Sequence, residues 1–146
     1  MRLLLMTIIS TLFFTSNIWE TDLNKAKQSA ENEHKYILLN FSGSDWCGPC
    51  IKMHKEIFET EEFDQYAKDN LVLLKADFPR LKKNQLTKEQ QSRNDQLAEV
   101  YNKEGKFPFT LLLNSDGKVL KSWDGYPHLS PDAFVNEVKA GINANH

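Results

Sequence analysis

The chain has 146 residues, of which 40% are apolar and 26% are charged, and its formal net charge is −2. A chain of this length can bury one substantial hydrophobic core and is too short to divide comfortably into two. Acidic and basic residues are interspersed along it. Because no basic stripe is long enough to neutralise a run of phosphates, we expect no nucleic-acid partner.

The N-terminal segment resembles an export signal. Arg2 is followed by the mostly apolar stretch from Leu3 to Phe14 and then by a polar tripeptide. About twelve apolar residues suit a secretory signal, whereas a membrane-spanning helix needs about twenty. We expect residues 1–17 to be a signal peptide, or an uncleaved anchor because no Ala-x-Ala site follows, and residues 18–146 to form the domain. The predicted location is the periplasm or cell envelope. Without a cysteine near this stretch, a lipoprotein is excluded.

The first half of the domain alternates helical and strand patterns. Apolar residues at helical spacing predict an amphipathic helix over residues 21–35. The continuous apolar run Tyr36–Phe41 predicts a strand that is covered on both faces. Helical periodicity resumes at Cys50, and a further short helix is expected over residues 61–68. The run Leu71–Asp77 predicts a second buried strand.

The second half begins with a polar stretch, residues 78–91, which predicts an exposed loop. A helix is expected from near Glu89 to Gly105, a residue suited to a left-handed C-terminal position. Two strand-like segments, Phe109–Asn114 and Lys118–Trp123, flank an Asp-Gly turn and predict a hairpin. A Ser-Pro-Asp start at Ser130 predicts a closing helix.

These elements give an extra N-terminal helix, a β-α-β unit, a connecting helix, an antiparallel hairpin and a closing helix. A right-handed crossover places helices on both faces of a central mixed sheet. The predicted fold class is therefore α/β, in one domain. Trp123 and Phe134 are expected in its core.

Both cysteines of the chain lie in the pentapeptide Trp46-Cys47-Gly48-Pro49-Cys50. The attacking species in disulfide exchange is a thiolate, and a free thiol at neutral pH is mostly protonated. Cys47 is placed where a strand ends and a helix begins, so backbone N–H groups and the helix dipole can stabilise its anion. Cys47 is the predicted nucleophile, and Cys50, one turn further, is the predicted resolving thiol. A purely structural disulfide is the alternative, but so short a loop constrains the unfolded chain little.

Residues 19–141 resemble the thioredoxin superfamily. The segment from Asn40 to Cys50 looks like its active-site strand and turn, and the Phe-x-Gly-Ser-x-Trp-Cys pattern is similar to exported bacterial thioredoxin-like proteins. The resemblance implies a thioredoxin fold and exchange of disulfides with protein clients. It also implies no cofactor beyond the Cys47–Cys50 disulfide itself.

A second part of the resemblance is the segment Gly105-Lys106-Phe107-Pro108-Phe109. The resemblance implies that Pro108 is a cis-proline facing the cysteines and that the backbone of Phe107 pairs with an extended client segment. We therefore expect Trp46, Gly48, Pro49, Phe107 and Pro108 to bind substrate.

One position departs from the superfamily pattern. Members commonly carry a buried aspartate on the strand before the motif, which helps to deprotonate the resolving cysteine, and the matching residue here is Asn40. An amide cannot accept a proton in that role. Either water or another group, such as Asp77, serves instead, or resolution by Cys50 is slower.

Other residues give weaker signals. His54 follows Cys50 at helical spacing, so the two cysteines and His54 are a nominal soft-metal set, but the fourth ligand is missing and a solvent-facing histidine is the favoured interpretation. We expect no metal site. The run Arg80–Lys83 is interpreted as a solvated loop that could attract acidic clients.

Three classes of function remain. The leading hypothesis is a thiol–disulfide oxidoreductase, which we expect to be a monomer. Gly48-Pro49 resembles reducing members of the superfamily, which favours a reductase, or an isomerase-like helper, recharged by a membrane electron donor. The alternatives are a copper or other soft-metal handling protein that uses the same cysteines, and a redox-inert binding module.

Overall fold

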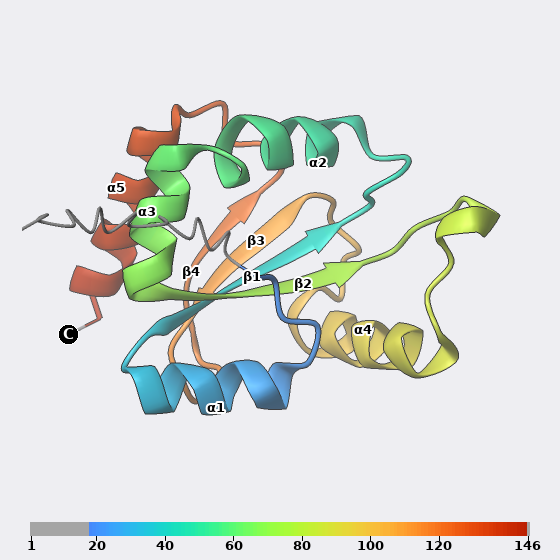
Figure 1. Cartoon of the computed structure of the whole chain (residues 1–146), viewed down its shortest axis with the longest axis horizontal. Coiled ribbons are helices and arrows are strands. Elements are labelled where there is room, and N and C mark those ends of the chain that lie inside the picture. Colours follow the sequence, from blue (N-terminus) through green and yellow to red (C-terminus); the bar gives the residue numbers. More distant parts are fainter. Residues whose placement is uncertain (1–17, 146) are drawn as a thin grey trace, which may run out of the picture.

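A computed structural model of the chain describes residues 18–145 and shows a four-stranded sheet between two layers of helices (Figure 1). The predicted signal segment, residues 1–17, lies outside the described residues. The elements in chain order are α1 (Leu23–Glu33), β1 (Tyr36–Ser42), α2 (Gly48–Met53), the π-helical η1 (His54–Phe58), α3 (Glu61–Asn70), β2 (Leu71–Asp77), the 3₁₀ turn η2 (Lys82–Asn84), α4 (Lys88–Tyr101), β3 (Phe109–Leu113), β4 (Val119–Asp124) and α5 (Pro131–Asn143).

The sheet has the strand order β2-β1-β3-β4, with β1 parallel to β2 and the other two pairs antiparallel. Asn40 on β1 lies opposite Lys75 on β2 and Thr110 on β3. Directly opposed residues point to the same face of a sheet, so these three side chains share a face. The predicted α/β fold with a mixed central sheet is confirmed.

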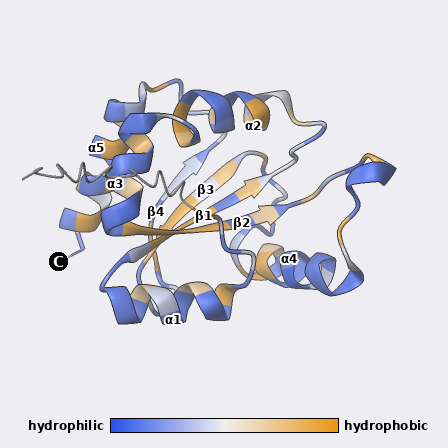
Figure 2. Cartoon of the chain, viewed as in Figure 1, coloured by the Kyte–Doolittle hydropathy of each residue, from blue (hydrophilic) through white to orange (hydrophobic). Residues whose placement is uncertain are grey.

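The helices divide between the two faces of the sheet, α1 and α4 on one and α2, α3 and α5 on the other (Figure 1). Each face has its own buried cluster. Leu38, Met53 and Phe134 belong to the cluster under α2, and Ala26 and Phe41 belong to the one beneath α1. Figure 2 shows β1 and β3 mostly apolar and the outer helix surfaces mostly polar, the pattern of a sheet covered on both sides.

Local sequence explains most helix ends. Asp22, Thr87 and Ser130 are N-caps whose side chains accept hydrogen bonds from backbone amides of the first turn of α1, α4 and α5. The helix α4 ends at Tyr101 rather than at the predicted Gly105. The reason is Asn102, whose side chain bonds the backbone of Lys106 and closes a loop there.

The segment before α1 adds a short bridge to the outer edge of β2. The N–H of Glu20 donates to the carbonyl of Leu73 (2.8 Å), and the N–H of Lys75 donates to the carbonyl of Glu20 (2.9 Å). Trp19 then packs edge-on against Phe58, with ring centroids 5.2 Å apart. An unpaired strand edge is a site of unwanted association, and this segment covers part of it.

Trp123 and Phe134 lie in the core, as predicted, with 8% and 0% of their surfaces exposed. Over residues 18–145, the helices are all too short or too polar to cross a membrane.

Candidate active site

Cys47 and Cys50 form a disulfide at the start of α2, with their Cα atoms 5.2 Å apart. Cys47 is the N-cap of that helix, directly after the turn that leaves β1. Pro49 occupies the first turn, where a missing N–H costs no helical hydrogen bond. The spacing of the motif therefore places both sulfurs at the positive end of a helix, as predicted.

Each sulfur accepts a hydrogen bond from a backbone amide. The N–H of Cys50 donates to Cys47 Sγ at 3.3 Å, and the N–H of Gly43 donates to Cys50 Sγ at 3.5 Å. The two cysteines are almost equally covered, with exposed fractions of 5% and 3%. Amide donors of this kind stabilise a thiolate relative to a thiol, so both sulfurs have a partner for a negative charge.

The turn between β1 and Cys47 is hydrogen-bonded to the end of β2 and to the residue that follows it. Ser44 donates from its backbone N–H and its hydroxyl to the carboxylate of Asp77. Trp46 Nε1 donates to the carbonyl of Phe78 at 2.7 Å. These contacts, made by groups more than thirty residues apart in the chain, fix the approach to the reactive cysteine. Asp77 was the predicted substitute proton acceptor, and its carboxylate here holds the turn.

Asp45, which lies between Ser44 and Trp46, accepts three more hydrogen bonds from the segment after β2. Its carboxylate accepts from the N–H of Arg80 (2.9 Å), the N–H of Leu81 (2.9 Å) and Asn84 Nδ2 (3.0 Å). The bond from Arg80, with those from Asn84 and Leu81, outweighs burial and lowers the pKa of Asp45 below its ordinary value.

Trp46 lies in an aromatic cluster at the rim of the disulfide. Its ring meets Phe107 edge-on at a centroid distance of 5.5 Å, and the guanidinium of Arg80 stacks over it at 3.6 Å. Phe107 also contacts Phe78, with centroids 5.5 Å apart. The structure thus brings Trp46 and Phe107, predicted substrate-binding residues from distant segments, to one place.

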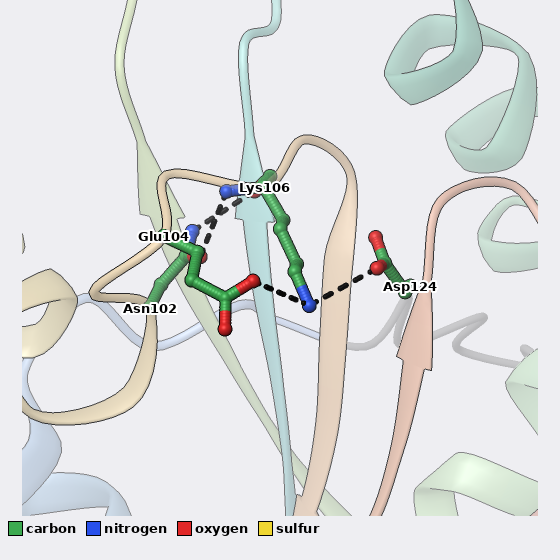
Figure 3. A network of polar contacts seen from close by, with 4 residues as sticks. All are labelled: Asn102, Glu104, Lys106 and Asp124. Atoms are coloured by element: carbon green, nitrogen blue, oxygen red, sulfur yellow. Dashed lines mark hydrogen bonds and ion pairs between the residues drawn. The ribbon is translucent and has the colours of Figure 1, made fainter.

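The Phe107–Pro108 peptide bond is cis, as the resemblance implied. A polar network holds the loop that precedes it (Figure 3). Lys106 Nζ pairs with Glu104 (3.0 Å) and with Asp124 at the end of β4 (3.1 Å), and the backbone of Lys106 is bonded twice to the side chain of Asn102. The hydrogen bond to Glu104, followed by that to Asp124, raises the pKa of Lys106, so its side chain stays charged.

Beneath α2, Asn40 is buried and donates from Nδ2 to Thr110 Oγ1 at 3.0 Å. The Thr110 hydroxyl in turn contacts Met53 Sδ at 3.9 Å. Met53 is one helical turn beyond Cys50, so Asn40 occupies the sheet face directly under the active-site helix. At this position, where superfamily members commonly carry a buried aspartate, the Asn40 amide is hydrogen-bonded to the Thr110 hydroxyl.

His54, which was predicted to face the solvent, is half-buried, with 35% of its side chain exposed. Its ring packs against Trp19 and Phe58, at centroid distances of 6.2 and 6.3 Å. Burial, reinforced by the positive charge of Lys75 and opposed by Glu59, lowers its pKa. The exposure is reduced because Trp19, in the segment that bridges to β2, lies against this part of the helix.

In the described part of the chain, no three His, Cys, Asp or Glu side chains are grouped so that they could hold a metal ion. His54 Nε2 lies 3.3 Å from Glu59, and both cysteine sulfurs are bonded to each other.

Four residues that support this site, Gly43, Asp45, Lys106 and Thr110, were not predicted from the sequence. Hydrophobic periodicity and motif spacing do not show which polar groups meet in the folded chain. The one sequence signal for Asp45 was its place immediately before Trp46-Cys47, in a turn beside the reactive cysteine.

A disulfide across Cys-x-x-Cys at the start of a helix, above a mixed four-stranded sheet and beside a cis-proline loop, defines a thiol–disulfide oxidoreductase. Comparison with known families agrees: residues 18–115 match the family model described as thioredoxin-like. The chain belongs to the thioredoxin-like family.

Relatives and solved structures that resemble this chain cover most of its length. The disulfide bond reductase DsbH of Chlamydia pneumoniae is 35% identical over 124 residues, which cover 85% of this chain and 72% of DsbH. A solved DsbH oxidoreductase structure superposes with a TM-score of 0.80 at 31% identity, covering 94% of this chain and 92% of that one. A disulphide isomerase from Xylella fastidiosa, at 20% identity and a TM-score of 0.59, covers 81% of this chain and 86% of its own, and shares the fold.

Proposed function

We propose that the chain is a protein-disulfide reductase of the cell envelope in which Cys47 is the nucleophile and Cys50 the resolving thiol. The observation that carries the proposal is the pair of amide donors, one on each sulfur: the N–H of Cys50 in the first turn of α2 and the N–H of Gly43 in the turn after β1. They favour the anion first at Cys47 and then at Cys50, which are the two positions where the reaction needs it.

The reaction transfers two electrons to the client. The Cys47 thiolate attacks one sulfur of a client disulfide, so that a Cys47–client bond forms and one client thiolate leaves. Cys50, as thiolate, then attacks Cys47 Sγ and releases the second client thiolate. The client disulfide is reduced to two thiols, and the chain is left with the Cys47–Cys50 disulfide. A membrane dithiol donor restores the reduced form.

The client is expected to bind as an extended segment beside the disulfide. We assign this contact to the backbone of Phe107 at the cis-Pro108 loop, with Trp46 at the rim and Gly48-Pro49 at the helix start. The aromatic contact of Trp46 with Phe107 and the ion pairs of Lys106 support this assignment, since they hold the active-site turn and the loop before Pro108 in place.

The direction of electron flow is proposed from two observations. The relative DsbH is named a disulfide bond reductase, and the cysteines here enclose Gly48-Pro49, which resembles reducing members of the superfamily. The proposed enzyme needs no cofactor, acts as a monomer on protein disulfides after export, and keeps residues 1–17 as its signal or membrane tether.

The test combines a potential with a trapping variant. The Cys47–Cys50 couple should equilibrate near the value for thioredoxin, about −270 mV, rather than near the roughly −120 mV of a strong oxidant. A Cys50→Ser variant should accumulate mixed disulfides on Cys47, and a Cys47→Ser variant should not. A strongly oxidising potential would overturn the reductase direction, and loss of trapping by Cys50→Ser would overturn the assigned roles.

The metal-handling alternative is tested with the same protein. Reduced chain is titrated with Cu(I) while its reduction of insulin disulfides is measured. Tight stoichiometric binding together with negligible insulin reduction would replace the proposed function by that of a copper carrier.

A further inference from the structure

The loop after β2 carries basic residues and no acidic ones. Between Asp77 and Glu89 the charged side chains are Arg80, Lys82, Lys83 and Lys88. All four are exposed, in a chain whose overall charge is negative. Figure 1 shows this segment, including η2, projecting beyond the end of the sheet. Excess positive charge on a projecting segment is available to an approaching partner.

This loop is fixed beside the reactive cysteine rather than free in solvent. Asp45 binds the backbone of Arg80 and Leu81 and the side chain of Asn84. The Arg80 guanidinium lies on the ring of Trp46, the residue immediately before Cys47. Arg80 is therefore held in place by contacts to the active-site turn itself.

The positive charges of the loop are not consumed within the protein. Arg80, Lys82 and Lys83 take part in none of the ion pairs found among residues 18–145. The carboxylates of Asp45 and Asp77 accept hydrogen bonds from backbone amides of the loop and of the turn. Leu81 adds a half-exposed apolar side chain (47%) between the cations.

From these observations we propose that the loop of residues 80–83 is a specificity surface that selects client segments with acidic residues near the reactive cysteine. The inference rests on the proposed reductase function and adds its substrate class. An acidic segment that enters beside Trp46 meets Arg80 first and then Lys82 and Lys83. The gain comes from long-range attraction and from solvent-exposed pairs, so it is modest and depends on salt.

The test uses three synthetic peptides that each contain one intramolecular disulfide and differ at three positions beside one cysteine. Those positions carry Glu, Ser or Lys. Each rate of reduction by the reduced chain is divided by the rate with dithiothreitol, which removes the effect of the flanking charge on the disulfide itself. At low salt the Glu peptide should be reduced about three- to tenfold faster than the Lys peptide. In 1 M salt, where the Debye length is about 3 Å, the ratio should fall toward one.

Charge reversal identifies the surface. Lys82→Glu/Lys83→Glu should invert the Glu-to-Lys peptide ratio. The matched control Lys118→Glu/Lys139→Glu changes the net charge equally, at exposed positions on the far hairpin and on α5, and should keep the wild-type ratio. Circular dichroism of both variants verifies that they are folded.

The outcomes separate the two proposals. If the Ser peptide is not reduced at all, the proposed function fails. If all three peptides are reduced at the same normalised rate, or if the control variant shifts the ratio as much as the loop variant, the specificity surface is wrong and the reductase function stands.

Discussion

The indole of Trp46 lies directly over Gly43. A β-carbon at position 43 would fall 2.3, 2.5 and 2.7 Å from three atoms of that indole, closer than any real packing permits. The same glycine donates its N–H to Cys50 Sγ and accepts the N–H of Cys47 at its carbonyl (2.9 Å). Gly43 therefore leaves room for the indole of Trp46 and contacts both cysteines through its backbone.

Replacing Gly43 by alanine should displace the indole and weaken the amide contact to Cys50. We expect a loss of about 1–3 kcal/mol in the free energy of unfolding, as for other overpacked sites. Denaturant unfolding of the oxidised protein measures it. Gly48→Ala is the matched control, because a β-carbon there has nothing within 4 Å. Equal stability of the two variants would show that the indole moves aside without cost.

Introducing the missing acid should alter resolution of the mixed disulfide. In Asn40→Asp a carboxylate beneath α2 can accept the Cys50 proton, so release of a trapped client should accelerate about tenfold or more at neutral pH and gain a new ionisation in its pH profile. Single-turnover release from a Cys47–peptide mixed disulfide measures it. Asn40→Ala, which loses the bond to Thr110 without adding an acid, is the control. An unchanged profile in Asn40→Asp would show that position 40 does not limit proton transfer.

The hydrogen bonds by which Asp45 holds the loop of residues 80–84 should depend on pH. Its pKa is held low by the Arg80 N–H above all, so the bonds are complete above the ordinary carboxyl pKa and are lost as the pH falls through the lowered value. Amide exchange of Arg80 and Leu81, followed by NMR, should be slow at pH 6 and fast in Asp45→Ala. Asp116→Ala, in the distant hairpin, should leave it slow. Protection that survives in Asp45→Ala would contradict the anchor.

Trp19 should stabilise the protein and set the titration of His54. Trp19→Ala removes the packing on Phe58 and should cost about 2–3 kcal/mol, while Ile18→Ala, at an 85% exposed neighbour, should cost almost nothing.

The same variant has a pH signature. Because burial above all lowers the pKa of folded His54, protons bind the unfolded chain more readily, and stability falls as the pH drops below the ordinary histidine value. Trp19→Ala exposes the ring, so the loss of stability between pH 7.5 and pH 5.5 should shrink. An undiminished pH dependence would place its origin elsewhere.

Most of the fold was predictable because β1, β2 and β3 are mostly apolar runs. The boundaries of β2, Leu71–Asp77, match the sequence pattern at both ends. The apolar run before the cysteines and the helical periodicity after them placed the pair at a helix start. The C-terminus of α4 was not predictable from Gly105, since the asparagine that closes the loop acts through a side chain whose partner is four residues away.

The supports of the site could not be derived from sequence for a different reason. Asp45 and its partners are 35 to 39 residues apart, and the contact exists only because β1 and β2 are parallel neighbours that end at the same edge of the sheet. Hydrophobic periodicity specifies which strands are buried but carries no information about which polar groups meet beyond their ends.

Three consecutive side chains before Cys47, those of Ser44, Asp45 and Trp46, direct their polar atoms to one other stretch of chain, residues 77–84. In evolution or in engineering, the two stretches are therefore an inseparable pair. A chimera that receives only one of them from a related protein would strand several donors and acceptors, whereas transplanting both together would carry the whole arrangement intact.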